Sequence, residues 1–261
     1  MSPTRILIDV PREIITAILE MKFRNPRFGN QRIAEQISHA FAVQIDKDIV
    51  RRVLAKHYGP DHPDASGPSW LTIFAQTKDS LWSVDLFRCE SILLRSHWVL
   101  VVIDVFTRRI IGFGIGGEYI DGPAVCRMFN QAIAGHASPA RVSTDHDPLF
   151  RFHRWLANLR IFEVEETKSV PYVPMSHTLI ERLIGTIRRE YLDHPFFWNS
   201  IALHRKLGKF RAYYNGARVH RSLNGTTPAN RAGSLSSPKA SLAHYAWEPH
   251  CNGLFETPVA A

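Results

Sequence analysis

Three stretches decide the fold of this 261-residue chain: LWSVDLF at residues 81–87, HWVLVVID at 97–104 and RIIGFGI at 109–115. In the first, Trp82 and Val84 alternate with Ser83 and Asp85. A period of two places alternate side chains on opposite faces of a β-strand. Short polar turns join the three stretches, so the sequence predicts three antiparallel strands.

The residues that follow alternate between helical and strand patterns. Strands followed by alternating helix and strand predict an α/β fold, a mixed five-stranded sheet with helices packed on its faces. The expected elements are a helix at 123–134, a strand at 140–145, a helix at 149–158 and a last strand at 161–166, then helices at 176–192 and 201–214. The last thirty or so residues lack a regular pattern, and we expect them to be irregular.

The residues before the strands form a different unit. Residues 11–24, 30–41 and 46–58 have the helical period, and the next segment is rich in Pro, Gly, Asp and Ser without periodicity. The sequence therefore predicts a small all-α domain at 1–58, a linker at 59–70, a core at 71–232 and a C-terminal tail at 233–261.

Charge and composition narrow the function classes. The formal net charge of +8 predicts attraction to polyanions such as nucleic acid. The cysteines and histidines lack zinc-ligand spacing, and three scattered cysteines suit a reducing compartment. Neither a signal peptide nor a membrane span is recognised, so we expect a cytoplasmic protein without a membrane partner.

Three carboxylates stand at positions where chemistry is often built. Asp85 lies within a strand, Asp145 ends one, and Glu181 lies on the exposed flank of a helix whose apolar stripe packs on the sheet. Each also has a structural explanation: Asp85 paired with an arginine such as Arg88, Asp145 starting the turn THDP, and Glu181 completing a capping box with Thr178.

Four motifs together resemble a known family. LWSVDLF with WVLVVIDVFTRRIIGF, then VSTDHDPLF, HTLIERLIGTIRREYLDH and YYNGARVHRSLNGTTPANRAG are similar, in order, to the retroviral-integrase-like core of bacterial insertion-sequence transposases. The resemblance runs from about Leu81 to Ala232. It implies a ribonuclease-H-like fold in which Asp85, Asp145 and Glu181 bind two Mg²⁺ or Mn²⁺ ions and catalyse DNA strand cleavage and strand transfer.

One position departs from the family pattern. The family usually has glycine two places after its second aspartate, where this chain has Asp147. Three roles are open for Asp147: crowding the metals, adding a ligand, or pointing to solvent. Asp104 matches a family position that is not catalytic, and we interpret it as structural. The alternative functions are an inactive transposase relic that binds DNA, and a nuclease acting on RNA in hybrids.

Basic residues suggest how DNA would be held. The excess of Arg and Lys between residues 182 and 221 indicates a phosphate-binding surface or a solvated helix face. The amino-terminal helices resemble a helix-turn-helix, whose later helix enters the major groove, or form a plain packing module. We expect a bacterial, nucleoid-associated homo-oligomer that joins element ends to target double-stranded DNA. The candidate DNA contacts are Lys47, Arg51, Arg52, Lys168 (on an expected mobile loop), Arg182, Arg188 and Arg189.

Overall fold

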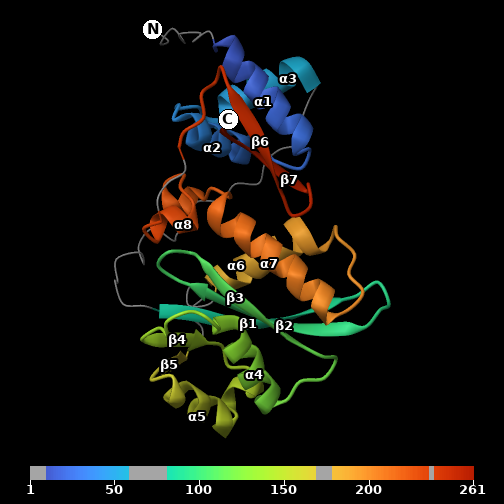
Figure 1. The fold of residues 1–261 in the computed structure, drawn as a ribbon, viewed down its shortest axis with the longest axis vertical. Helices are drawn as coiled ribbons and strands as arrows, with labels where there is room; N and C mark the ends of the chain where they lie inside the picture. Colours follow the sequence, from blue (N-terminus) through green and yellow to red (C-terminus); the bar gives the residue numbers. More distant parts are fainter. Residues whose placement is uncertain (1–9, 59–80, 169–177, 235–237) are drawn as a thin grey trace, which may run out of the picture. The chain divides into compact units, whose positions relative to one another are not determined.

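The computed structural model describes residues 10–58, 81–168, 178–234 and 238–261. The chain forms two compact units (Figure 1). One comprises Met1–Trp70 together with Ala217–Ala261, and the other comprises Leu71–Gly216. The predicted linker at 59–70 lies outside the described residues.

A five-stranded mixed sheet forms the centre of the second unit, with strand order β3-β2-β1-β4-β5. The three strands expected from the opening motifs pair antiparallel, and β4 and β5 add in parallel beside β1. This confirms the predicted mixed α/β sheet. The strands are β1 (Leu81–Glu90), β2 (Ser96–Asp104), β3 (Ile110–Gly116), β4 (Arg141–Thr144) and β5 (Glu165–Lys168).

Helices cover both faces of this sheet (Figure 1). Trp82 and Val84 of β1 belong to a buried apolar cluster that includes Phe129 and Trp155 on one face. The helices on that face are α4 (Gly122–Ile133), the short 3₁₀ turn η2 (Pro148–Arg151) and α5 (His153–Ile161). The opposite face carries α6 (Thr178–Thr186), the π-helical turn η3 (Ile187–Leu192) and α7 (Ser200–Gly216).

Two glycines let α4 lie directly on β3. A Cβ atom on Gly112 would come within 2.0 Å of the Ala132 carbonyl oxygen, and one on Gly114 within 2.0 Å of the Met128 carbonyl oxygen. Neither backbone atom can give way as a flexible side chain would. The GFG of the third strand motif is therefore required by the helix–sheet distance.

The last strand of the sheet lies later than predicted. Residues 161–166 were expected to form it, but Ile161 ends α5, and Glu163 turns the chain with a φ of 56°. β5 spans Glu165–Lys168, where each residue pairs in parallel register with one of β4. Lys168, expected on a mobile loop, therefore lies in a strand.

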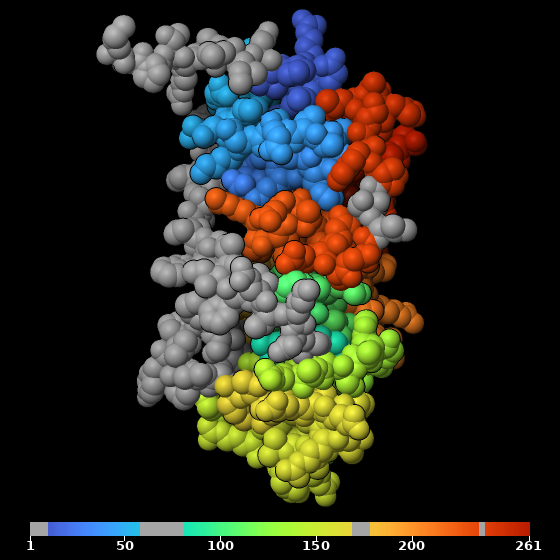
Figure 2. Space-filling model, turned by 90° about the vertical axis from the view of Figure 1, so that its left-hand side faces the viewer, coloured from blue at the N-terminus to red at the C-terminus, as the bar shows by residue number. Residues whose placement is uncertain are grey.

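Three helices and a hairpin form the first unit. The predicted helices are confirmed as α1 (Arg12–Arg24), α2 (Asn30–Phe41) and α3 (Lys47–Tyr58). The expectation of an irregular tail is wrong: β6 (Tyr245–His250) and β7 (Phe255–Ala260) form an antiparallel hairpin. The short helices η4 (Arg221–Leu223) and α8 (Pro228–Arg231) precede it. Figure 2 shows this segment, coloured red, against the blue amino-terminal helices.

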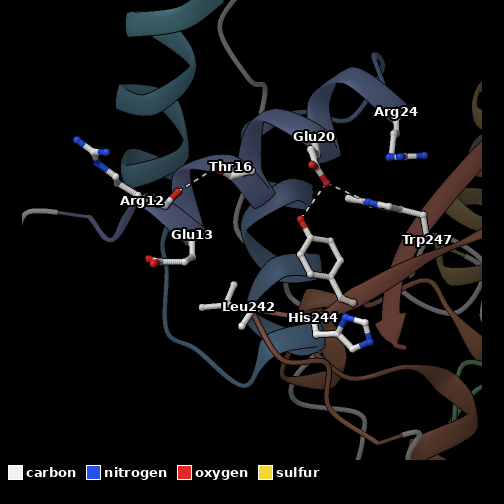
Figure 3. Close-up of a pocket in the computed structure, with 10 residues that line it drawn as sticks. Arg12, Glu13, Thr16, Glu20, Arg24, Leu242, His244 and Trp247 are labelled. Atoms are coloured by element: carbon white, nitrogen blue, oxygen red, sulfur yellow. Dashed lines mark hydrogen bonds between the residues drawn. The ribbon is translucent and has the colours of Figure 1, made fainter.

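Buried polar side chains join the C-terminal segment to the helices. Gln36 of α2 is 4% exposed, accepts a hydrogen bond from the Val219 amide at 3.1 Å and donates one to the Ala217 carbonyl at 3.2 Å. At a groove of about 580 Å³ beside α1, Glu20 accepts hydrogen bonds from the Tyr245 hydroxyl and the Trp247 indole (Figure 3). The predicted boundary at residue 232 thus differs from the observed division, which comes at 216.

In the part of the chain that the structure describes, no helix combines the length and the apolar character that crossing a membrane requires.

Candidate active site

The two predicted catalytic aspartates lie on or just beyond two adjacent parallel strands, Asp85 within β1 and Asp145 after the end of β4. The register of β1 and β4 pairs Leu81 with Arg141 and Ser83 with Ser143. This pairing ends at Ser83 and Ser143, two residues before Asp85 and Asp145 respectively. Thr144 ends β4, so Asp145 is the first residue beyond its carboxyl end, the edge of a parallel sheet where sites are commonly built.

The first aspartate lies on the sheet face that α6 and η3 cover. Phe87, two residues along β1 from Asp85, lies on the same face, and the Arg188 guanidinium lies 5.6 Å from its ring centroid. Arg188 also donates a hydrogen bond to the Arg88 carbonyl at 3.2 Å. Asp85 is half-buried, and its Oδ1 accepts a hydrogen bond from the Leu86 amide at 2.7 Å.

The alternative in which Asp85 pairs with Arg88 is not favoured. The Arg88 guanidinium donates to the Ser96 hydroxyl at 2.5 Å and lies 5.8 Å from the ring centroid of Trp98. Both partners belong to β2. Because residues 85 and 88 are three apart on a strand, their side chains leave opposite faces of the sheet.

Glu181 lies in the first turn of α6 with its side chain exposed. Ile180 and Leu183 are buried beside it and fix the helix against the sheet. Gly185 follows one turn later, and a Cβ there would lie 3.2 Å from a nitrogen of the Arg189 guanidinium. The glycine therefore makes room for a cationic group on the same flank as Glu181.

The three carboxylates do not form a set of metal ligands. Across residues 10–58, 81–168, 178–234 and 238–261, no group of three or more His, Cys, Asp or Glu side chains is arranged to hold a metal ion. Asp85 of β1 and Asp145, which follows β4, carry the hard oxygen donors that a divalent cation prefers. Glu181 would have to approach them to complete it.

The structure assigns a local role to Asp147. Its carboxylate accepts a hydrogen bond from the Leu149 amide at 2.8 Å and so caps η2. Its amide donates to Asp145 Oδ1 at 3.0 Å. With a φ of −56°, this position places no demand for glycine on the backbone.

Asp104 is structural, as expected. It accepts hydrogen bonds from the Phe106 and Thr107 amides at 2.8 and 2.9 Å and so shapes the turn between β2 and β3.

A buried polar network adjoins Asp145, and the sequence did not indicate it. Glu166 of β5 accepts hydrogen bonds from Thr144, Trp155 and Lys168. Lys168 also donates to Thr144 Oγ1 and to the Phe150 carbonyl. All three N–H groups of the ammonium thus have protein acceptors, and contact of Lys168 with DNA stays a prediction. The one sequence feature that corresponds to this network is the pair of opposite charges, Glu166 and Lys168, two residues apart in a short polar stretch.

The other predicted DNA contacts are exposed. Arg182, Arg188 and Arg189 are exposed on α6 and η3 of the second unit. Lys47, Arg51 and Arg52 are exposed on α3 of the first unit. Arg51 pairs with Asp48 at 3.0 Å, a solvent-exposed contact that contributes little to stability.

Comparisons with known proteins agree with this architecture. Residues 163–228 match the family model of the integrase core domain. The chain is similar to a simian T-cell lymphotropic virus intasome in complex with PP2A regulatory subunit B56 gamma, at 17% identity and a TM-score of 0.51, covering 83% of this chain and 80% of that chain.

Two isolated integrase cores give weaker structural matches. The catalytic core domain of HTLV-2 integrase, in complex with magnesium, is 18% identical with a TM-score of 0.44, covering 57% of this chain and 93% of that chain. The core of BIV integrase is 17% identical with a TM-score of 0.43, covering 58% and 92%. A comparison with curated proteins finds no match. The family-model match and the intasome likeness confirm the resemblance to an integrase core and the ribonuclease-H-like fold.

Proposed function

We propose that this integrase-type chain is a DDE transposase that cleaves double-stranded DNA at element ends and joins it to a target. Asp85, Asp145 and Glu181 are its catalytic carboxylates. The observation that supports the proposal is the parallel pairing of β1 and β4, which ends at Ser83 and Ser143, two residues before Asp85 and Asp145.

The resemblance assigns Glu181 as the third carboxylate, and the packing of α6 is compatible with this assignment. α6 contacts β1, the strand that carries Asp85. Arg188, in the turn η3 that follows α6, donates a hydrogen bond to the Arg88 carbonyl of the same strand.

Two Mg²⁺ or Mn²⁺ ions bound by these carboxylates would stabilise charge on the entering and leaving oxygens of the phosphodiester. Asp85 belongs to the sheet and Asp145 directly follows β4, so these two would form the fixed part of the site. Glu181 completes it from the helix, and its exposure leaves room for DNA at the same place. The reaction needs no covalent enzyme intermediate.

Exposed arginines beside Glu181 would hold the phosphate backbone. Arg188 and Arg189 lie within about two turns of Glu181, and Arg182 is its neighbour. In the first unit, α3 would place Lys47, Arg51 and Arg52 in the major groove. Each chain has one catalytic triad, whereas joining two element ends requires two, so the active form is a homo-oligomer.

A second candidate is an inactive transposase relic that binds DNA, because the exposed arginines of α3, α6 and η3 would serve DNA binding with or without cleavage. The two functions differ in cleavage but not in DNA binding, so a cleavage assay separates them.

The experiment measures cleavage and joining of element-ended and random-ended DNA with Mg²⁺ or Mn²⁺. Glu181→Gln removes the charge and keeps the size of the side chain, and Glu118→Gln, at an exposed position of another segment, is its control. Metal-dependent activity that is lost only in Glu181→Gln, with DNA binding retained, supports the transposase. DNA binding by the wild type without cleavage under any metal supports the relic.

A further inference from the structure

In the polar network beside Asp145, four side chains are joined to one another by hydrogen bonds. One oxygen of Glu166, Oε1, accepts from Lys168 Nζ at 2.6 Å, from Thr144 Oγ1 at 2.7 Å and from Trp155 Nε1 at 2.9 Å. Lys168 Nζ donates in addition to Thr144 Oγ1 at 3.0 Å. Thr144 and Trp155 are fully buried, the Glu166 side chain is 9% exposed, and the Lys168 side chain is 33% exposed.

This network holds both ends of the loop that carries Asp145. Thr144 immediately precedes Asp145, and Lys168 also donates to the carbonyl of Phe150 at 3.1 Å. Residues 145–149 therefore start and finish at groups bound by one ammonium. Within the loop, Asp147 caps the turn and its amide donates to Asp145.

We propose that Glu166 and Lys168 are positioning residues that fix the Asp145 loop beside β1. The inference rests on the proposed function for its catalytic meaning, because it takes Asp145 as a catalytic carboxylate. The clamp itself is a structural claim about residues 144–150 and can be tested without catalysis.

Holding β4 and β5 together does not require such a network. The same two strands carry a second ion pair, Arg141 with Glu165 at 3.2 Å, whose side chains are 51% and 71% exposed. A buried ion pair is a weak source of stability compared with packed apolar side chains. An apolar pair at 166 and 168 would still pair the strands, but it could not bind Thr144, Trp155 and Phe150. The hydrogen bonds of Glu166 and Lys168 therefore indicate that these two residues hold the loop that carries Asp145 in place.

The test compares Glu166→Gln with Glu165→Gln. The two positions are adjacent on β5, but the first side chain is buried in the network and the second is exposed. Lys168→Met removes the ammonium group. Lys168→Arg keeps the positive charge but changes the geometry of its hydrogen-bond donors. Three quantities are measured in the full-length protein: hydrogen exchange of the backbone amides of residues 144–147, 149 and 150, the indole N–H resonance of Trp155, and the Mg²⁺ concentration for half-maximal strand cleavage.

We expect Glu166→Gln and Lys168→Met to accelerate exchange in the loop by about tenfold or more and to shift the Trp155 resonance. We also expect the Mg²⁺ requirement to rise at least about fivefold, with part of the activity recovered at saturating Mg²⁺ and in Lys168→Arg. Glu165→Gln should stay within about twofold of the wild type in all three measurements.

Equal effects of Glu166→Gln and Glu165→Gln on exchange would overturn the clamp. So would faster exchange spread evenly over the second unit, because that would indicate general destabilisation. If Glu166→Gln does not fold, Thr144→Val removes one hydroxyl at constant shape, and unchanged loop exchange in that variant would equally overturn the proposal. If the wild type never cleaves DNA, the proposed function fails, while the exchange and resonance data still decide the clamp.

Discussion

Asn25, the residue after α1, pairs with Glu256 of β7 through both atoms of its side-chain amide. Its Nδ2 donates to the Glu256 carbonyl at 2.8 Å, and its Oδ1 accepts from the Glu256 amide at 2.9 Å. Asn25 is 2% exposed. The Asn25 side chain thus makes the same two hydrogen bonds with the Glu256 backbone that a residue of a neighbouring β-strand would make. This pairing joins residues 231 positions apart and attaches the C-terminal hairpin to the helices of the first unit.

Replacing Asn25 with alanine is expected to destabilise the first unit. The change leaves the partly buried amide and carbonyl of Glu256 without their Asn25 partners, which costs about 1–2 kcal/mol. The control is Asn130→Ala, which removes an exposed amide pair with Asn158 and should cost less than about 0.5 kcal/mol. Denaturant unfolding followed by tryptophan fluorescence measures both. Similar losses in the two variants would mean that the Asn25 pairing does not hold the hairpin.

The basic residues of α3 are expected to act through DNA phosphates. Combined substitution of Lys47, Arg51 and Arg52 by alanine should weaken binding and flatten the slope of log K against log salt by about 0.9 for each phosphate that is no longer neutralised. Arg160→Ala, an exposed arginine of α5, serves as the single-charge control. Fluorescence anisotropy between low and moderate salt measures the slope. An unchanged slope in the triple variant would favour the plain packing module for these helices.

The Cys89 thiol is expected to make the free energy of unfolding depend on pH. Burial, opposed by Arg188, raises the pKa of Cys89 to about 11. Between about pH 9 and pH 11 the unfolded chain loses this proton and the folded protein keeps it, so stability falls as pH rises. The stability advantage of the wild type over Cys89→Ala should shrink by roughly 2 kcal/mol across this window. Parallel stability curves for the two proteins would contradict the raised pKa.

The strands with regular patterns were predictable, and those with irregular patterns were not. β1 and β2 alternate or concentrate apolar side chains because helices cover both sheet faces. β5 reads EETK, and its position is set by pairing with β4 rather than by its own period. The hairpin carries Pro249 and Pro258, residues that fit only edge strands or irregular chain, so local sequence favoured the latter.

For the candidate site as well, some residues could be predicted from sequence motifs, whereas the roles of others depend on the tertiary structure. The motifs predicted Asp85, Asp145 and Glu181, and the structure pairs β1 with β4 in parallel up to two residues before the first two. The role of Asp147 depended on backbone geometry, since capping η2 requires a turn that residue types alone do not specify. The engagement of Lys168 depended on the shift of β5, which only tertiary pairing determines.

The most direct test of the catalytic assignment compares Asp145→Asn with Asp147→Asn in Mg²⁺-dependent strand cleavage. Both changes remove one negative charge from the same loop, and asparagine caps a helix about as well as aspartate. We predict that Asp145→Asn reduces the cleavage rate by about a hundredfold or more with DNA binding retained, whereas Asp147→Asn stays within about threefold of the wild type. Wild-type cleavage rates in Asp145→Asn, or equal reductions in both variants, would contradict the assignment.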